Sequence, residues 1–390
     1  MSNPSIAILA ARRTAIGSFQ GQFSSTSAVD LGAAAIEAAL GDSGLDPEEV
    51  SEILMGCVLP AGVGQAPARQ ASLAAGIPQG AGCTTLNKVC GSGMKAVMLG
   101  NDLIRAGSAG IVVAGGMESM TRAPYLVDRS LRMGHQQLAD HMFLDGLQSP
   151  FDGHMMGHFG EMCVGKYGFS REDQDAFSIR SVERAMKATE SGAFGEEITP
   201  VTVKSRKGEI QVDTDEEPPR CDIDKIPHLR PAFAKDGTIT AASSSKISDG
   251  GAALVLAPAS VASERGLPVL ATITAHATHS QAPEWFTTAP VGALGKVLDK
   301  AGWSAGEVDL YEINEAFAAV TMAAMHDLEL DPEKVNVHGG ACALGHPIGA
   351  SGARILVTLI HALRKRGGKK GVASLCIGGG EATAIAIELA

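Results

Sequence analysis

Two glycine-rich stretches, Cys90–Gly93 (CGSG) and Gly349–Gly352 (GASG), decide the fold of this chain. Each is followed by an expected helix, then by a short apolar strand (GIVVA after the first, GVASLCI after the second), and then by a glycine turn that leads into Glu118 or Glu381. We interpret the two copies as a duplicated α/β unit whose halves face each other. Each half then offers the N-terminus of a helix to a shared cleft. Chance agreement between glycine-rich turns is the alternative.

Hydrophobic periodicity extends this α/β pattern along the chain. Apolar residues at helical spacing alternate with short β-rich runs, which is typical of sheets covered by helices. We expect the GIVVA strand to end at Gly115-Gly116. The expected helices are 28–40, 95–105, 171–188 and 351–365, and the expected strands are 52–59, 110–114, 371–377 and 383–389.

The middle of the chain, 121–246, has a different character. It is richer in charge, proline and histidine, and its one strong helix begins at the capping residues Ser170 and Asp173. The polar stretch 204–235 is typical of extended loops. We therefore predict an insertion that projects from a compact α/β body.

Composition narrows the classes of function. The chain has 390 residues, 47 glycines and a formal net charge of −11, which argues against non-specific DNA binding. No apolar run approaches the ~18 residues of a membrane span, and Arg12 and Arg13 follow the first apolar run, which is the wrong order for a signal peptide. Seven cysteines without a C-x-x-C pair predict free thiols in a reducing cytoplasm and no zinc site.

Cys90 is the first candidate for chemistry, because it lies at an expected strand-to-helix turn. The positive end of a helix macrodipole lowers the pKa of a thiol and favours the nucleophilic thiolate. A small buried hydrophobic role is equally compatible with the local pattern.

Three further residues could complete a site. His346 lies between glycine-rich segments and could act as the base or cationic partner of a cysteine. Cys376 precedes three glycines whose N–H groups could bind an oxyanion, and the thiol could be an acid/base or a buried structural group. Asn314 follows an apolar run and could hold a water or a histidine.

Other histidines are weaker candidates. His154 and His158 lack the glutamate of an H-E-x-x-H zinc helix, and Gly157 between them disfavours a helix. His276 and His279 are expected in a surface loop. The chain also lacks a P-loop and a G-x-S-x-G motif, and we expect no metal site.

Six motifs taken together, in the order NKVCGSGMKAV, GGMESM, LRPAF, NEAFA, GHPIGASGAR and CIGGG, resemble the thiolase family. The resemblance covers essentially the whole chain. It implies a five-layered fold of two duplicated βαβαβαββ halves, with an N-terminal half of 1–120 and 247–268 and a C-terminal half of 269–390. It also implies an inserted loop domain of 121–246 that binds coenzyme A and carries a tetramerisation loop.

The resemblance implies an acyltransferase that condenses two acetyl-CoA to acetoacetyl-CoA and CoA, reversibly and through an S-acetyl group on Cys90. His346 would activate Cys90 and, with a water held by Asn314, bind a thioester oxygen. Cys376 would be the acid/base, and the N–H groups of Cys90 and Gly378 would form a second oxyanion hole. No permanently bound cofactor is implied, since the CoA thioesters are substrates.

Substrate contacts follow from the same resemblance. Ser245 would contact the pantetheine arm of CoA and Arg220 a phosphate. The matching pocket positions are Leu147, Met156, Phe233, Ala316 and Phe317.

This chain departs from the usual family pattern near those contacts. It has Ala242-Ser243-Ser244-Ser245-Lys246 where Gly-Asn-Ala-Ser-Gly is common, Met155 where histidine is common, and Glu381-Ala382 after the triple glycine. These positions bear on acyl length, so a 3-ketoacyl-CoA thiolase of broader chain length in fatty-acid β-oxidation is the alternative function.

The segment 123–156 resembles the loop that joins dimers into tetramers in biosynthetic thiolases, which implies a homodimer that assembles into a homotetramer. The same resemblance implies no nucleic acid or membrane partner and a cytoplasmic location. Two rivals are weaker. A carrier-protein-dependent ketoacyl synthase lacks the second cysteine, and a non-catalytic CoA-binding protein would not need Cys90, His346, Asn314 and Cys376 together.

Overall fold

One mixed sheet runs through the whole molecule. The computed structural model describes residues 4–130, 132–205 and 208–390. Residues 1–3, 131, 206 and 207, which fall within the predicted segments 1–120, 121–246 and 204–235, lie outside the described residues. The sheet has 11 strands, and two short ones, β2 (Gly17–Ser18) and β8 (Ile198–Thr199), lie off its main path. The main path is β13 (Leu310–Ile313), β14 (Lys370–Ile377), β15 (Glu381–Leu389), β12 (Ala271–Ser280), β1 (Ile6–Thr14), β11 (Ser248–Pro258), β5 (Ile111–Ser119), β3 (Val50–Gly56) and β4 (Gly82–Leu86).

The two ends of this sheet repeat one arrangement. In one half β3 pairs in parallel with β4 and β5, and β11 pairs antiparallel with β5 and β1. In the other half β13 pairs in parallel with β14, and β15 pairs antiparallel with β14 and β12. A short antiparallel contact between β1 and β12, centred on Ala7 and Thr272, joins the halves.

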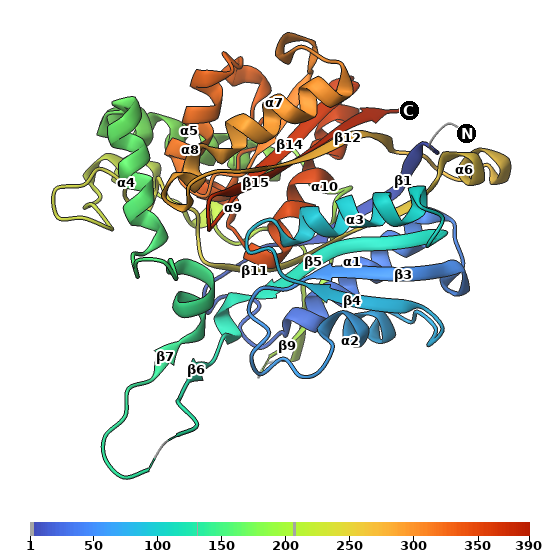
Figure 1. Ribbon diagram of the computed structural model, residues 1–390, viewed down its shortest axis with the longest axis horizontal. Helices are drawn as coiled ribbons and strands as arrows, with labels where there is room; N and C mark the ends of the chain where they lie inside the picture. Colours follow the sequence, from blue (N-terminus) through green and yellow to red (C-terminus); the bar gives the residue numbers. More distant parts are fainter. Residues whose placement is uncertain (1–3, 131, 206–207) are drawn as a thin grey trace.

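Helices complete five layers (Figure 1). Between the half-sheets lie α3 (Ser92–Arg105) and α10 (Ile348–Arg366), which contact each other. Every residue of α10 from Ile348 to Leu363 is buried, as expected for a helix covered on all sides. The outer faces carry α1 (Ala28–Ser43) and α2 (Pro67–Ala74) on one side and α7 (Ala289–Ala301) and α8 (Ala318–Asp327) on the other. The expected five-layered α/β fold is confirmed.

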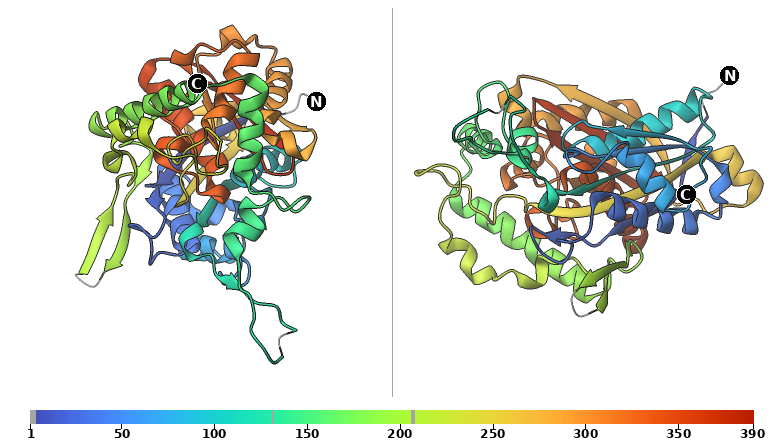
Figure 2. Two further views of the ribbon diagram at one scale, coloured as in Figure 1. Left: turned by 90° about the vertical axis from the view of Figure 1, so that its left-hand side faces the viewer. Right: turned by 90° about the horizontal axis from the view of Figure 1, so that it is seen from below.

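The insertion projects from this body as predicted (Figure 2). A hairpin of β6 (Tyr125–Leu126) and β7 (Ala139–Asp140) extends furthest, and α4 (Met156–Tyr167) and α5 (Arg171–Glu190) follow it. The expectation of loops alone over 204–235 is wrong, because β10 (Gly208–Val212) pairs with β9 (Val201–Ser205) and two 3-10 turns follow. Val212 and Val203 are buried in an apolar cluster, which stabilises this second hairpin. The remaining helices are α6 (Ala259–Arg265) and α9 (Ala341–Leu344).

The GIVVA strand does not end at its glycines, so that prediction is wrong. It continues to Ser119, with Gly115 and Gly116 inside β5. A Cβ on Gly115 would overlap the carbonyl oxygen of Ala252, and one on Gly116 would overlap that of Gly349. These glycines are therefore required by close main-chain approach rather than by a turn.

Two predictions about histidine-bearing segments are also wrong. Gly157 and His158 lie inside α4, where the Phe233 ring occupies the space that a Cβ on Gly157 would need. His276 and His279 lie on β12, where His276 Nε2 is 2.8 Å from Asp102 Oδ1. None of the helices among the described residues is long and apolar enough to span a membrane.

Candidate active site

Cys90 lies on a strained turn between β4 and α3. The preceding residue, Val89, has a φ of +47°, a left-handed conformation that is unusual for a β-branched side chain. Ser92 fixes the turn, since its hydroxyl donates to the carbonyl of Val89 (2.7 Å) and accepts from the N–H of Lys88 (2.8 Å). A side chain on such a turn is held in one orientation at the start of a helix.

The environment of Cys90 does not favour a resting thiolate. Burial raises the pKa of Cys90 to about 11, although the backbone N–H groups of Gly378 and of Cys90 itself oppose the rise. The expectation that the helix N-terminus lowers this pKa is therefore wrong, because the loss of solvation outweighs the dipole. The thiol needs a base to become a nucleophile.

His346 can supply that base. Its Nδ1 lies 2.6 Å from Ser351 Oγ, and the Ser351 hydroxyl donates its proton to the carbonyl of Pro347 (2.9 Å). Nδ1–H must then donate to Ser351, which leaves the lone pair on Nε2. Burial and the charge of Arg354 lower the pKa of His346 to about 3, so the imidazole is neutral.

Asn314 and Cys376 lie at the ends of neighbouring strands. The Asn314 N–H donates to the carbonyl of Ser374 on β14 (3.0 Å), and its Nδ2 donates to His346 Nε2 (3.4 Å). Asn314 Oδ1 is buried and has no partner among the described residues. Cys376 is fully buried, which raises its pKa well above the ordinary value, and the Cys90 sulfur contributes to that rise.

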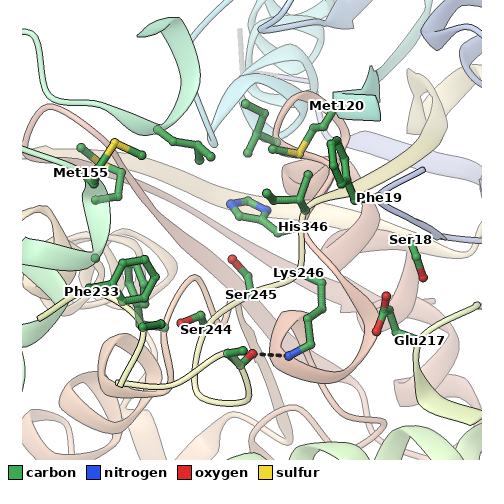
Figure 3. Close-up of a pocket in the computed structure, with 18 of the residues that line it drawn as sticks. Ser18, Phe19, Met120, Met155, Glu217, Phe233, Ser244, Ser245, Lys246 and His346 are labelled. Atoms are coloured by element: carbon green, nitrogen blue, oxygen red, sulfur yellow. Dashed lines mark hydrogen bonds between the residues drawn. The ribbon is translucent and has the colours of Figure 1, made fainter. Parts of the chain in front are cut away.

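A cavity of about 480 Å³ opens beside these groups, with His346 on its wall (Figure 3). Cys90 packs in the same apolar cluster as Leu147 and Ile348, which line the cavity. Cys376 is in the cluster that contains Met156 and Phe317. The predicted residues that line the cavity are Leu147, Met156, Arg220, Phe233, Ser245, Phe317 and His346.

Ala316 is the predicted pocket residue that does not line the cavity. It is buried beside Phe317, and its carbonyl oxygen accepts the N–H of Ser245 (3.0 Å). Its contribution is therefore to hold the loop that presents Ser245 to the cavity.

Two cationic side chains, Arg220 and Lys246, line the cavity. The Arg220 side chain is 62% exposed and is paired with Glu216 at 2.8 Å. Lys246 lines the cavity and donates to the carbonyl of Ala241. In the sequence this residue was identified only as a departure from the family pattern. Figure 3 shows Lys246 on the same side of the cavity as Glu217, so the positive charge is partly compensated.

Sequence reasoning missed several lining residues. Two of them had a signal in the sequence, because Met120 ends the GGMESM motif and Ser244 lies in the departing run 242–246. The lining residues that were not assigned to the pocket are Ser18, Phe19, Met120, Phe143, Ser244 and Ile247.

Two family profiles match almost the entire chain. The profile for the thiolase N-terminal domain matches residues 6–260, and that for the thiolase C-terminal domain matches residues 267–389. The chain belongs to the thiolase family. Among the described residues of this thiolase, no group of three or more histidine, cysteine, aspartate or glutamate side chains could hold a metal ion.

Relatives of this thiolase share its full length. An acetyl-CoA acetyltransferase from Pseudomonas aeruginosa is 49% identical over 98% of both chains, and acetyl-CoA acetyltransferase 1 from Arabidopsis thaliana is 49% identical over 98% of this chain and 94% of its own. The crystal structure of the Bacillus anthracis acetyl-CoA acetyltransferase superposes with a TM-score of 0.97 at 40% identity, covering 100% of each chain. A thiolase from Ascaris suum in complex with coenzyme A gives a TM-score of 0.94 at 44% identity, covering 99% of this chain and 100% of its own.

Proposed function

We propose that this thiolase is an acetyl-CoA acetyltransferase, which condenses two acetyl-CoA to acetoacetyl-CoA and CoA and catalyses the reverse thiolysis. One observation carries the proposal: the cavity wall holds a neutral His346 whose tautomer leaves Nε2 unprotonated, and the half-buried Cys90 packs against Ile348 on the same wall. The buried Cys376 thiol interacts with the Cys90 sulfur. The Gly378 N–H, two residues after Cys376, faces the Cys90 sulfur. The names of the relatives that match the full length support the same substrate.

The first half-reaction forms an acetyl-enzyme. Nε2 of His346 takes the thiol proton of Cys90, and the sulfur attacks the thioester carbonyl of acetyl-CoA. The N–H groups of Cys90 and Gly378 are the donors for the oxygen that becomes negative. The bond to the CoA sulfur then breaks, and Cys376 gives its proton to that departing sulfur.

The second half-reaction forms the carbon–carbon bond. The Cys376 thiolate is a strong base because burial disfavours its charge, and it removes a proton from the methyl group of a second acetyl-CoA. His346, now protonated, and a water on Asn314 Oδ1 stabilise the enolate oxygen. The enolate carbon attacks the acetyl group on Cys90, and the released Cys90 sulfur recovers its proton from His346.

Chain length is the decisive experiment. We expect kcat/KM for thiolysis of acetoacetyl-CoA to exceed that of longer straight-chain 3-ketoacyl-CoA thioesters by about tenfold or more, since Met156, Phe233 and Phe317 wall the cavity. Similar values along the series would favour the alternative, a broader 3-ketoacyl-CoA thiolase, for which the flexible Met155 beside Met156 is the supporting observation. No consumption of any of these thioesters would refute both.

CoA recognition and domain division are part of this proposal. We propose that Ser245 contacts the pantetheine arm and Arg220 the phosphates, with no permanently bound cofactor. The division into two halves, 1–120 with 247–268 and 269–390, around a loop domain of 121–246 is supported by the repeated strand order and by the projecting insertion.

We further propose a homodimer that assembles into a homotetramer. The strand β4 has no neighbour on its outer side among the described residues, so its free edge can pair with a second copy. The hairpin within 123–156 exposes Tyr125, Val127 and Leu138 by more than half, which supports its role as the tetramerisation loop. Sedimentation of the intact chain and of a variant with all three changed to serine tests this, with a dimer expected for the variant. The seven free thiols support a reducing compartment such as the cytoplasm.

A further inference from the structure

Glu118, on β5, is a buried carboxylate that the reaction scheme leaves unused. Its side chain is fully buried, and every hydrogen bond it makes is with a donor. Oε2 accepts the N–H groups of Val58 (3.0 Å) and Gly349 (2.9 Å), and Oε1 accepts that of Leu59 (3.2 Å). Val58 and Leu59 lie in the loop after β3, in the first copy of the duplicated unit, whereas Gly349 is the second residue of α10, in the other copy. This carboxylate therefore connects the two copies.

One arm of this connection leads to the nucleophile. The carbonyl of Val58 accepts Nδ2 of Asn87 (3.4 Å), and Oδ1 of Asn87 accepts the N–H of Val89 (2.8 Å). Val89 is the strained residue before Cys90. The position of the Cys90 turn therefore depends on where Glu118 holds Val58.

The other arm leads to the base. Gly349 lies in the first turn of α10, where Ser351 accepts Nδ1–H of His346. Holding the N–H of Gly349 fixes the start of this helix and with it the acceptor that orients the imidazole. The main chain of Gly349 also lies against Gly56 and Gly93, so little space remains for an alternative position.

We propose that Glu118 is a positioning residue that sets the separation of Cys90 from His346, by bridging the turn of one half to the helix of the other. The predicted effect of Glu118 on turnover rests on the proposed function. Its predicted effect on the reactivity of Cys90 does not. A neutral amide cannot replace the carboxylate, because one end of the amide is a donor and would face a backbone N–H. A misplacement of reacting groups by about 1 Å is enough to slow a reaction by ~10²-fold.

The test uses Glu118→Gln in the full chain, with Asp249→Asn as the matched control. Asp249 is also a fully buried carboxylate that accepts a backbone N–H, that of Thr121 (3.0 Å), but it has no hydrogen bond to Val58 or Gly349. Two quantities are measured on each protein: kcat and KM for thiolysis, and the rate of Cys90 alkylation by iodoacetamide at neutral pH, followed by peptide mass spectrometry.

For Glu118→Gln we expect kcat to fall by about tenfold or more, KM to stay within about threefold, and Cys90 alkylation to slow by a similar factor to kcat. For Asp249→Asn we expect both rates within about threefold of the unmodified chain. Unchanged kcat and alkylation in Glu118→Gln would overturn the proposal, as would equal losses in both variants. If the unmodified chain shows no thiolysis, the proposed function fails while the alkylation comparison still tests Glu118.

A second variant covers the case in which Glu118→Gln does not fold. Asn87 is exposed, and Asn87→Ala removes the hydrogen bonds that link Val58 to Val89. This variant should show the same loss of kcat and of Cys90 alkylation rate as Glu118→Gln, with KM little changed. If both variants fold, their combination should lose no more than the worse single variant, because they interrupt one bridge. Full activity of Asn87→Ala, or strictly additive losses, would contradict the bridge.

Discussion

Replacing Ser351 by alanine tests whether the tautomer of His346 controls the reaction. Ser351 is fully buried and is the partner of His346 Nδ1 at 2.6 Å. Without it, Nδ1–H has no acceptor, and an unsatisfied buried donor costs about 1–3 kcal/mol. The imidazole can avoid that cost by moving its proton to Nε2, where it can no longer deprotonate Cys90.

The magnitude follows from this cost. A penalty of about 1–3 kcal/mol on the reactive tautomer lowers its population by roughly 5- to 150-fold, so kcat should fall by the same factor, about 5- to 150-fold. KM should change less, because Ser351 does not line the cavity. The loss should be visible in the acetylation of Cys90 by acetyl-CoA under single-turnover conditions.

The matched control is Ser374→Ala. Ser374 is also fully buried, and its hydroxyl donates to the carbonyl of Thr383 (2.9 Å) without touching His346. Both variants lose buried hydrogen bonds, so thermal unfolding of each shows whether lower stability explains a lower rate. If Ser351→Ala keeps kcat within about threefold of the unmodified chain, the tautomer argument is wrong.

Three other outcomes are expected. Cys90→Ala should form no acetyl-enzyme when its intact mass is measured after incubation with acetyl-CoA. Cys376→Ala should still be acetylated, but product analysis should find no acetoacetyl-CoA. Acetylation of Cys90→Ala would refute the assignment of the nucleophile. Gly157→Ala should raise KM several-fold by displacing the Phe233 ring from the cavity wall, while Gly165→Ala on the same helix, where nothing lies within 4 Å of the new Cβ, should leave KM unchanged. The free energy of unfolding should be larger near pH 6.5 than near pH 9, because burial raises the pKa of Glu312 to about 8. The folded state then binds more protons than the unfolded state between the ordinary carboxyl pKa and about 8, so stability is lost as the pH rises through 8. Equal unfolding free energies at both pH values would contradict that reasoning.

The local pattern was sufficient where a short segment controls its own conformation. Ser27 and Ser170 cap α1 and α5 as their sequences indicate, and the expected helices and strands occur with shifted ends. It was insufficient where a distant segment takes the space, as at Gly116, whose lack of a side chain is explained by Gly349 rather than by a turn. The pKa of Cys90 shows the same limit, since a helix N-terminus can be read from the sequence and burial cannot.

The sequence by itself determined the duplicated α/β unit and the projecting insertion, because repeated glycine turns and periodic apolar residues are local properties of the chain. Only the tertiary structure decided which nitrogen of His346 is unprotonated, that Lys246 and Phe19 line the cavity, and that Glu118 links the two halves. These depend on distances between residues far apart along the chain. Hydrogen bonding and desolvation act over a few ångströms in space, whatever the separation in sequence.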